Sequence, residues 1–430
     1  MRRTIAEDPD WSLVTVPNLS VFCLHSIVRN FEEHPSYEDL PPNQKDFVEE
    51  RLSPSLPLHV TANTIHDGVY WERCCKRRWE LCVVSLYGHS WKRMFFERHL
   101  ENVIELFIPD VTGQCIVLEL VPLCKNYVKR LNISQLLPPI RELQGEEEES
   151  CSALGSDDER DGPSMDHFDF SILLHLLTNL EELHLSYAVQ QCGMNFQWNM
   201  VEMTNRDCES LGKALKSCKT LKLLKLQQSH VDDKKCRMLV KYLLDHPSLR
   251  ELDFSYNLIG DEGARALGKL LTQSKLETLN MSSNQIRGPG AKAIAHALSG
   301  NPALLSLNLR LNLLGDEGGE AIAKALMSNN TLQHLHLPAN RMTRPTAVAL
   351  SEALLQNKSL KTLNLCCNQL GVDGGKALEE AMSSNSTLTS CDIYQTEVDE
   401  QSFSFINRVV RTNQEEERRA DELKTDELIN

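Results

Sequence analysis

Apolar residues return at a fixed interval through the second half of the chain. The pattern L-x-x-L-x-L-x-x-N recurs every 27 or 28 residues, and its copies begin at Leu221, Leu249, Leu276, Leu304, Leu332, Leu360 and Leu388. A period of about 20–29 residues is typical of leucine-rich repeats, which stack so that neighbouring units bury one continuous core. A degenerate copy at Leu180, Leu183 and Leu185 extends the predicted stack toward the N-terminus.

Each repeat divides into a predicted strand and a predicted helix. The L-x-L core places apolar side chains at every second position, as in a strand that buries one face. The asparagine that closes the motif can bond backbone groups in the turn that follows. The second half of each repeat, for example 263–271, has apolar residues at helical spacing. We therefore predict an α/β leucine-rich-repeat horseshoe with parallel strands on its concave face and helices on its convex face.

The remaining sequence predicts three further regions. Residues 1–144 contain no repeat and are expected to form a smaller, mainly helical N-terminal domain. Residues 145–165 are acidic and poor in bulky apolar residues, so we expect a disordered linker. The repeats are assigned to 166–411, with an inserted loop within 188–205, and a charged tail to 412–430.

One amphipathic helix stands out in the N-terminal region. Apolar residues recur at helical spacing from Trp91 to Phe107, and Lys92, Arg93 and Arg98 make part of the other face basic. A basic amphipathic helix can dock into a calmodulin-like partner. We favour the simpler interpretation, a core helix of a small domain with a solvated face.

Composition narrows the possible partners. The formal net charge is −15 and the sequence pI is about 5.5, which argues against nucleic acid and against an anionic membrane surface. The N-terminus has no apolar segment typical of a secretory signal, and no stretch is long enough to span a membrane, so we expect a cytoplasmic protein. The 14 cysteines lack metal-site spacing, which predicts reduced thiols and no metal or other cofactor.

The chain carries no recognisable catalytic motif. Phosphate-binding glycine loops, zinc-binding helices and nucleophile elbows are absent from the sequence, so we expect neither an enzyme nor a small-molecule substrate. The best candidates for a binding surface are polar residues that alternate with the core leucines, because they face the concave side. These protein-binding candidates are Lys225, Asp253, Asn280, Asn308, Arg310, His336, Asn364 and Asp392. Any solvated sheet face would carry similar residues, so both interpretations stay open.

The repeat unit resembles the ribonuclease-inhibitor type of leucine-rich repeat, which also occurs in Ran GTPase-activating protein and innate-immune receptors. The runs 90–102, 192–199 and 306–312 further resemble the leucine-rich-repeat subunits of the nexin–dynein regulatory complex. This resemblance implies a non-catalytic structural and regulatory subunit that helps to link doublet microtubules in the axonemes of motile cilia and sperm flagella. It also implies that the partners are other subunits of that complex and axonemal proteins.

Two other functions share this repeat type. A GTPase activator similar to Ran GTPase-activating protein would fit the repeats and Arg310. The acidic segment here precedes the repeats, however, and the large N-terminal region has no counterpart in that family. A ubiquitin-ligase substrate receptor would need an adaptor-binding helix set within residues 12–60, and that segment shows no convincing match.

Overall fold

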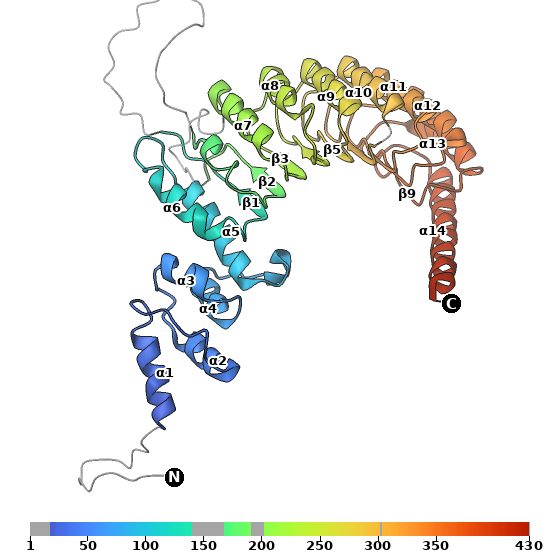
Figure 1. Ribbon diagram of the computed structural model, residues 1–430. Coiled ribbons are helices and arrows are strands. Elements are labelled where there is room, and N and C mark those ends of the chain that lie inside the picture. Colours follow the sequence, from blue (N-terminus) through green and yellow to red (C-terminus); the bar gives the residue numbers. More distant parts are fainter. Residues whose placement is uncertain (1–17, 140–166, 191–201, 302, 430) are drawn as a thin grey trace, which may run out of the picture. The chain divides into compact units, whose positions relative to one another are not determined.

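The computed structural model describes residues 18–139, 167–190, 202–301 and 303–429 (Figure 1). The chain divides into two compact units, Met1–Glu101 with Cys115–Lys129, and Asn102–Gln114 with Arg130–Asn430. The predicted linker 145–165 and most of the predicted inserted loop lie outside the described residues. Among the described residues, no helix combines the length and hydropathy that crossing a bilayer requires.

The first unit is helical, as predicted. Its elements are α1 Leu19–Arg29, α2 Pro42–Arg51, α3 Leu58–Thr64, α4 Val69–Arg78, the short helix η1 Val84–Tyr87, α5 Trp91–Glu105, which continues into the second unit, and α6 Cys115–Cys124. Aromatic side chains form its centre. The fully buried ring of Trp71 lies 5.1 Å from that of Phe95 and 5.2 Å from that of Phe96, between ring centroids. Such aromatic pairs stabilise a core beyond the area they bury.

Helix α5 uses its basic side chains within the first unit. Lys92 is buried, and its Nζ donates to the carbonyl oxygen of Ile65 at 2.6 Å. The Nε of Arg93 donates to the Glu97 carboxylate at 2.7 Å, and that carboxylate is buried. These contacts favour the core-helix interpretation, because a calmodulin-type target would present such cations to its partner.

The second unit is built on a parallel sheet. Its nine strands are β1 Arg130–Ile133, β2 Glu182–Leu185, β3 Leu223–Leu226, β4 Glu251–Asp253, β5 Thr278–Asn280, β6 Ser306–Asn308, β7 His334–His336, β8 Thr362–Asn364 and β9 Ser390–Asp392. They pair in chain order, and within this unit they line the inner side of an arc whose outer side is helical (Figure 1). The register aligns the central buried leucine of each strand with that of the next, as in the pair Leu279 and Leu307. This arrangement confirms the predicted horseshoe.

The helices of the second unit follow the strands. They are η2 Phe170–Ile172, α7 Asn205–Ser217, α8 Asp233–Leu243, α9 Asp261–Gln273, α10 Gly288–Gly300, α11 Gly315–Leu326, α12 Arg344–Gln356, α13 Gly371–Met382 and α14 Glu400–Ile429. Each buries one apolar face against the sheet. Helix α9, for example, buries Leu267, Leu270 and Leu271 and exposes Arg265 and Lys269.

A ladder of asparagines runs through the interior of the turns. Its members are Asn257, Asn284, Asn312, Asn340 and Asn368, and all are buried. The Asn312 side chain donates to the carbonyl oxygens of Met281 (2.9 Å) and Leu309 (3.0 Å) and accepts from the Ile286 amide (3.0 Å). The ladder therefore satisfies turn backbone that lacks a strand partner, as the sequence predicted.

A second ladder lies at the C-terminal ends of the helices. Asn329 donates to the Leu298 carbonyl at 2.9 Å and accepts from the Leu332 amide at 2.8 Å. Equivalent side chains belong to Asn301, Asn357, Asn385 and Asn413. Since Asn413 lies in α14, the first half of that helix completes the last repeat, and the chain continues as helix through the predicted tail.

Left-handed backbone occurs at the residue before each ladder asparagine, and before Ser229 and Thr396 at the equivalent positions of the flanking repeats. These residues are Gln228, Tyr256, Ser283, Leu311, Ala339, Cys367 and Gln395, with φ between 47° and 58°. Non-glycine residues adopt this conformation at a cost of roughly 1–2 kcal/mol. The surrounding hydrogen bonds of the turn therefore impose it, and nothing in the residue types announces it.

The sheet begins earlier than the sequence indicated. Strand β1 lies within the region assigned to the N-terminal domain, and it pairs in parallel register with β2 from Arg130↔Glu182 to Ile133↔Leu185. The boundary at 144–166 therefore needs correction, and the repeat sheet starts at Arg130. The β1 sequence Arg-Leu-Asn-Ile escaped notice because its leucine-repeat motif is incomplete.

Candidate partner-binding surface

The concave face carries one continuous row of polar side chains. Register pairing aligns the predicted residues strand by strand, in the order Lys225, Asp253, Asn280, Asn308, His336, Asn364 and Asp392. All seven are of intermediate exposure, whereas the leucines between them are buried. The structure thus brings the predicted residues together, and pairing extends the row to His184 and Asn132 on β2 and β1.

Most of these residues also end their own strands. The side-chain oxygen of Asp253 accepts from the Ser255 amide at 2.9 Å, and that of Asn308 accepts from the Arg310 amide at 3.0 Å. Asn280, Asn364 and Asp392 make the same bond to the amide two residues ahead. The local turn therefore accounts for one oxygen of each of these five side chains. Part of the remaining capacity is used within the row, since Asn280 donates to Asp253 and Asn364 donates to Asp392, both at 3.0 Å.

His336 departs from this pattern for a physical reason. Pro338 stands two residues ahead of it and has no amide to donate, so a turn-forming asparagine would find no partner there. Burial and the neighbouring His334 lower the pKa of His336 below its ordinary value, which favours the neutral ring. A neutral imidazole can both donate and accept, so His336 suits a polar partner of either kind.

Arg310 is the most accessible of the predicted residues. It follows β6, whose Asn308 pairs with His336 on β7, so the two candidate anchors lie on adjacent strands as expected. The residue is exposed, and its guanidinium makes no ion pair with another described residue. Its five donors are therefore available to carboxylates or carbonyls of a partner.

His184, near the first end of the row, is half-buried and has a strongly shifted pKa. Burial, together with the charges of Lys225 and Arg130, lowers the pKa of His184 to about 4. At neutral pH this imidazole is uncharged. The sequence missed His184 because the repeat to which it belongs is degenerate.

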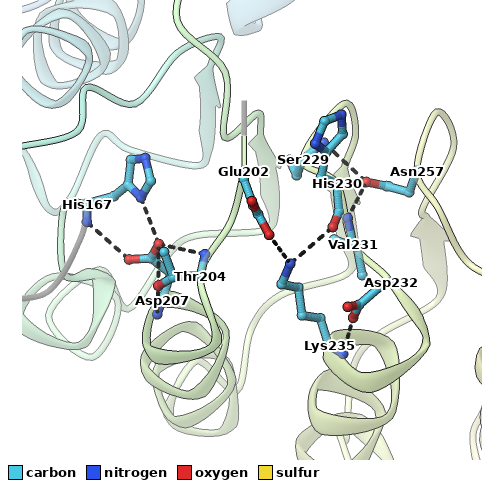
Figure 2. Close-up of polar contacts among 10 residues, drawn as sticks. All are labelled: His167, Glu202, Thr204, Asp207, Ser229, His230, Val231, Asp232, Lys235 and Asn257. Carbon is cyan, nitrogen blue, oxygen red and sulfur yellow. Dashed lines mark hydrogen bonds and ion pairs between the residues drawn. The ribbon is translucent and has the colours of Figure 1, made fainter. Parts of the chain in front are cut away.

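A polar junction lies where the described chain resumes after residues 140–166, at His167, and after residues 191–201, at Glu202 (Figure 2). His167 is buried, and its Nδ1 lies 2.7 Å from the Asp207 carboxylate, which also caps α7 by bonding Thr204. On the next helix, the Lys235 ammonium donates to Glu202 at 3.1 Å. These contacts join both segments to the first two long helices of the repeats, α7 and α8. Only the spacing of Thr204 and Asp207 could have indicated the junction, since it matches a capping box.

The described residues contain no cluster of side chains suited to a metal ion. No cluster of three or more His, Cys, Asp or Glu side chains there could hold an ion. The 12 cysteines in the same parts of the chain are free thiols. Burial raises the pKa of the Cys208 thiol to about 12, so this sulfur behaves as a small apolar group.

Comparison with known proteins agrees with the repeat architecture. A family model described as Leucine Rich repeat matches residues 245–268, 272–295, 300–323 and 356–378. These segments cover β4 with most of α9, β5 with most of α10, β6 with most of α11, and β8 with most of α13.

Three relatives carry the same name, Dynein regulatory complex subunit 5. The protein of Macaca fascicularis is 49% identical over 306 residues, which cover 71% of this chain and 61% of that protein. The Mus musculus protein is 53% identical over 63% of this chain and 54% of its own length. The Chlamydomonas reinhardtii protein is 33% identical over 52% of each chain.

The matched region therefore spans between about half and three fifths of each relative. The fold and the relatives agree with the resemblance that the repeats and the runs outside them had indicated. The chain contains a leucine-rich-repeat horseshoe and is related in sequence to the proteins named Dynein regulatory complex subunit 5.

Proposed function

We propose that the chain is a non-catalytic subunit of the nexin–dynein regulatory complex in the axonemes of motile cilia and sperm flagella. There it would help to link doublet microtubules and regulate dynein-driven motility. The observation that carries this proposal is the shared name of relatives from mammals and Chlamydomonas reinhardtii at 33–53% identity. The solenoid supports it, because stacked repeats offer extended surfaces for protein partners.

The concave row is the surface that we assign to partner subunits. It combines cationic donors such as Lys225 and Arg310 with anionic acceptors such as Asp253 and Asp392. Adjacent strands are about 4.8 Å apart, so the row offers closely spaced polar groups along the arc. A mixed polar surface of this kind matches the polar character of protein interfaces and selects partners by complementary charge.

Localisation tests the proposal as a whole. A tagged copy of the chain expressed in ciliated cells should be retained along the axoneme after detergent extraction, and high salt should release it only together with other complex subunits. A diffuse signal lost on mild detergent extraction would contradict the assignment to the complex.

A paired substitution tests the concave face. Arg310→Glu with His336→Glu should reduce recovery of partner subunits in pull-downs at least tenfold, because the new carboxylates would repel the acceptors that we propose to lie opposite them. Arg344→Glu with Lys324→Glu, at exposed positions on α12 and α11 of the outer side, is the matched control. Circular dichroism should be unchanged in both. Equal recovery by the two variants would exclude Arg310 and His336 as anchors.

A GTPase-activating role is the second candidate, and Arg310 is the observation that favours it. An exposed arginine without an ion pair could orient or stabilise a bound GTPase. Single-turnover GTP hydrolysis by a panel of small GTPases, with and without the chain, tests this role. Acceleration that Arg310→Ala abolishes would support GTPase activation over the axonemal proposal.

A further inference from the structure

The outer surface of the second unit is divided by charge. The exposed side chains of α7 to α10 include nine lysines and arginines and only two glutamates. The cations are Arg206, Lys213, Lys216, Lys234, Arg237, Lys241, Arg265, Lys269 and Lys292. The exposed side chains of α11 to α13 reverse this balance, with three cations and five carboxylates. In a chain of net charge −15, the first four helices therefore form a local basic surface, which we call the basic outer face.

The repeat places these cations in rows. Lys213, Lys241 and Lys269 are spaced 28 residues apart and occupy the same position on three successive helices. Consecutive helices of the solenoid pack against each other, which sets their axes about 8–10 Å apart. The row therefore presents one ammonium group per helix at nearly regular intervals across the helix axes. Arg237, Arg265 and Lys292 form a parallel row.

The chain neutralises this surface only in part. Lys213 pairs with Glu209 and Arg265 with Glu262 at 2.8 Å, and Lys292 pairs with Glu317 at 2.7 Å, all between highly exposed side chains. Exposed pairs of this kind contribute little and exchange readily with a partner's charge. Lys216, Lys234, Arg237, Lys241 and Lys269 have no ion pair with any described residue. Within the described chain, most of the positive charge on the basic outer face therefore lacks a counter-charge.

We propose that the basic outer face binds an extended, glutamate- or aspartate-rich segment of a partner protein. An extended chain advances about 3.3–3.6 Å per residue, so every third residue would meet the next helix and its cation. The acidic outer face of α11 to α13 limits such a segment to four helices, or roughly ten residues. Long polyanions such as nucleic acid would be repelled where they follow the arc further. This inference concerns the helical side and does not rest on the concave-face proposal.

Peptide binding by the full chain tests the basic outer face directly. The probe is a fluorescein-labelled peptide of ten glutamates, measured by fluorescence anisotropy at 50 mM NaCl. The variant Arg237→Gln, Lys241→Gln, Lys269→Gln should bind it about tenfold more weakly, since three exposed ion pairs are lost. The control Lys324→Gln, Lys358→Gln, Lys376→Gln removes equal charge from the other half and should stay within twofold. Equal weakening in both variants would overturn the proposal.

Other occupants give different outcomes. Single-stranded DNA of twelve nucleotides and phosphatidylserine vesicles test other anions at 150 mM NaCl. If either binds more tightly than the peptide, the basic outer face is a general polyanion site, and the proposal of a protein segment is wrong. A sedimentation coefficient that rises with protein concentration would indicate self-association. If the triple variant abolishes that rise, the occupant of the basic outer face is the acidic outer face of a second copy of the chain. Neutralising Glu146–Glu149 to glutamine should leave the peptide affinity unchanged. A tenfold rise would mean that the chain's own acidic residues compete for this face, which would overturn binding by a partner.

Discussion

The solenoid uses asparagine in two rows that differ in burial. Asn312 of the interior ladder and Asn308 of the concave row lie four residues apart in one repeat. Asn312 is buried and makes bonds to several backbone groups, whereas Asn308 is partly exposed and accepts one backbone bond at 3.0 Å. The same side chain is structural in one row and available to a partner in the other. Residue type therefore does not distinguish a structural asparagine from an accessible one, whereas burial does.

Removing one asparagine from each row should separate these roles most clearly. Asn312→Ala should lower the free energy of unfolding by about 3 kcal/mol, because it leaves buried carbonyl and amide groups without partners. Asn308→Ala should cost about 1 kcal/mol or less, since water can reach the Arg310 amide that it frees. Urea unfolding followed by circular dichroism measures both. Similar losses in the two variants would contradict the distinction between the rows.

His184 sharpens the comparison, because it belongs to the half-buried concave row and its pKa is strongly lowered by burial. Its pKa of about 4 in the folded chain lies below the ordinary 6.5 of an unfolded histidine. As the pH falls, the unfolded chain therefore takes up a proton at His184 before the folded chain does. The stability that neutral His184 allows is complete above pH 6.5 and is lost as the pH falls toward 4. Between pH 7 and pH 5 the loss from this residue should be about 2 kcal/mol.

Comparison of variants isolates that contribution from other titrating groups. Urea unfolding of His184→Gln at both pH values should show about 2 kcal/mol less pH dependence than the unaltered chain. His296→Gln, at an exposed position on α10, serves as the control and should keep the original dependence. An unchanged pH dependence in His184→Gln would mean that His184 is accessible to protons in the folded chain.

Backbone conformation should give the smallest effect. Ala339 has a φ of 54°, so Ala339→Gly should raise the free energy of unfolding by about 0.5 kcal/mol. The strain relieved in the folded chain exceeds the conformational entropy that glycine adds to the unfolded chain. Ala349→Gly within α12 should instead lower it by about 1 kcal/mol. Thermal or urea unfolding of the pair tests the sign. Destabilisation by both substitutions would show that the left-handed turn is not strained.

The sequence predicted the parts of the fold that depend on periodic burial. Leucine spacing identified eight of the nine strands and the helices that follow them, because a stacked repeat requires the same apolar position in every unit. The interior asparagine ladder followed from the same regularity. The concave residues could be assigned to one face, because side chains alternate along a strand.

Features that depend on contacts between distant or irregular segments could not be predicted from the sequence. Strand β1 pairs with β2 across 52 residues, as in Arg130↔Glu182, without a full motif of its own. The buried contact between His167 and Asp207 joins two residues 40 positions apart. The basic outer face emerges only after the helices are aligned by repeat, since its cations are scattered along 206–292.

Each helix from α8 to α13 touches, among the described helices, only the one before and the one after it. A solenoid connected in this way stores deformation as many small rotations at successive interfaces, so it behaves mechanically as a spring and not as a rigid block. A load applied near α7 and another near α14 would therefore change the curvature of the whole arc. Any partner seated on the concave row would experience that change as an altered spacing between its contacts, which couples tension to affinity.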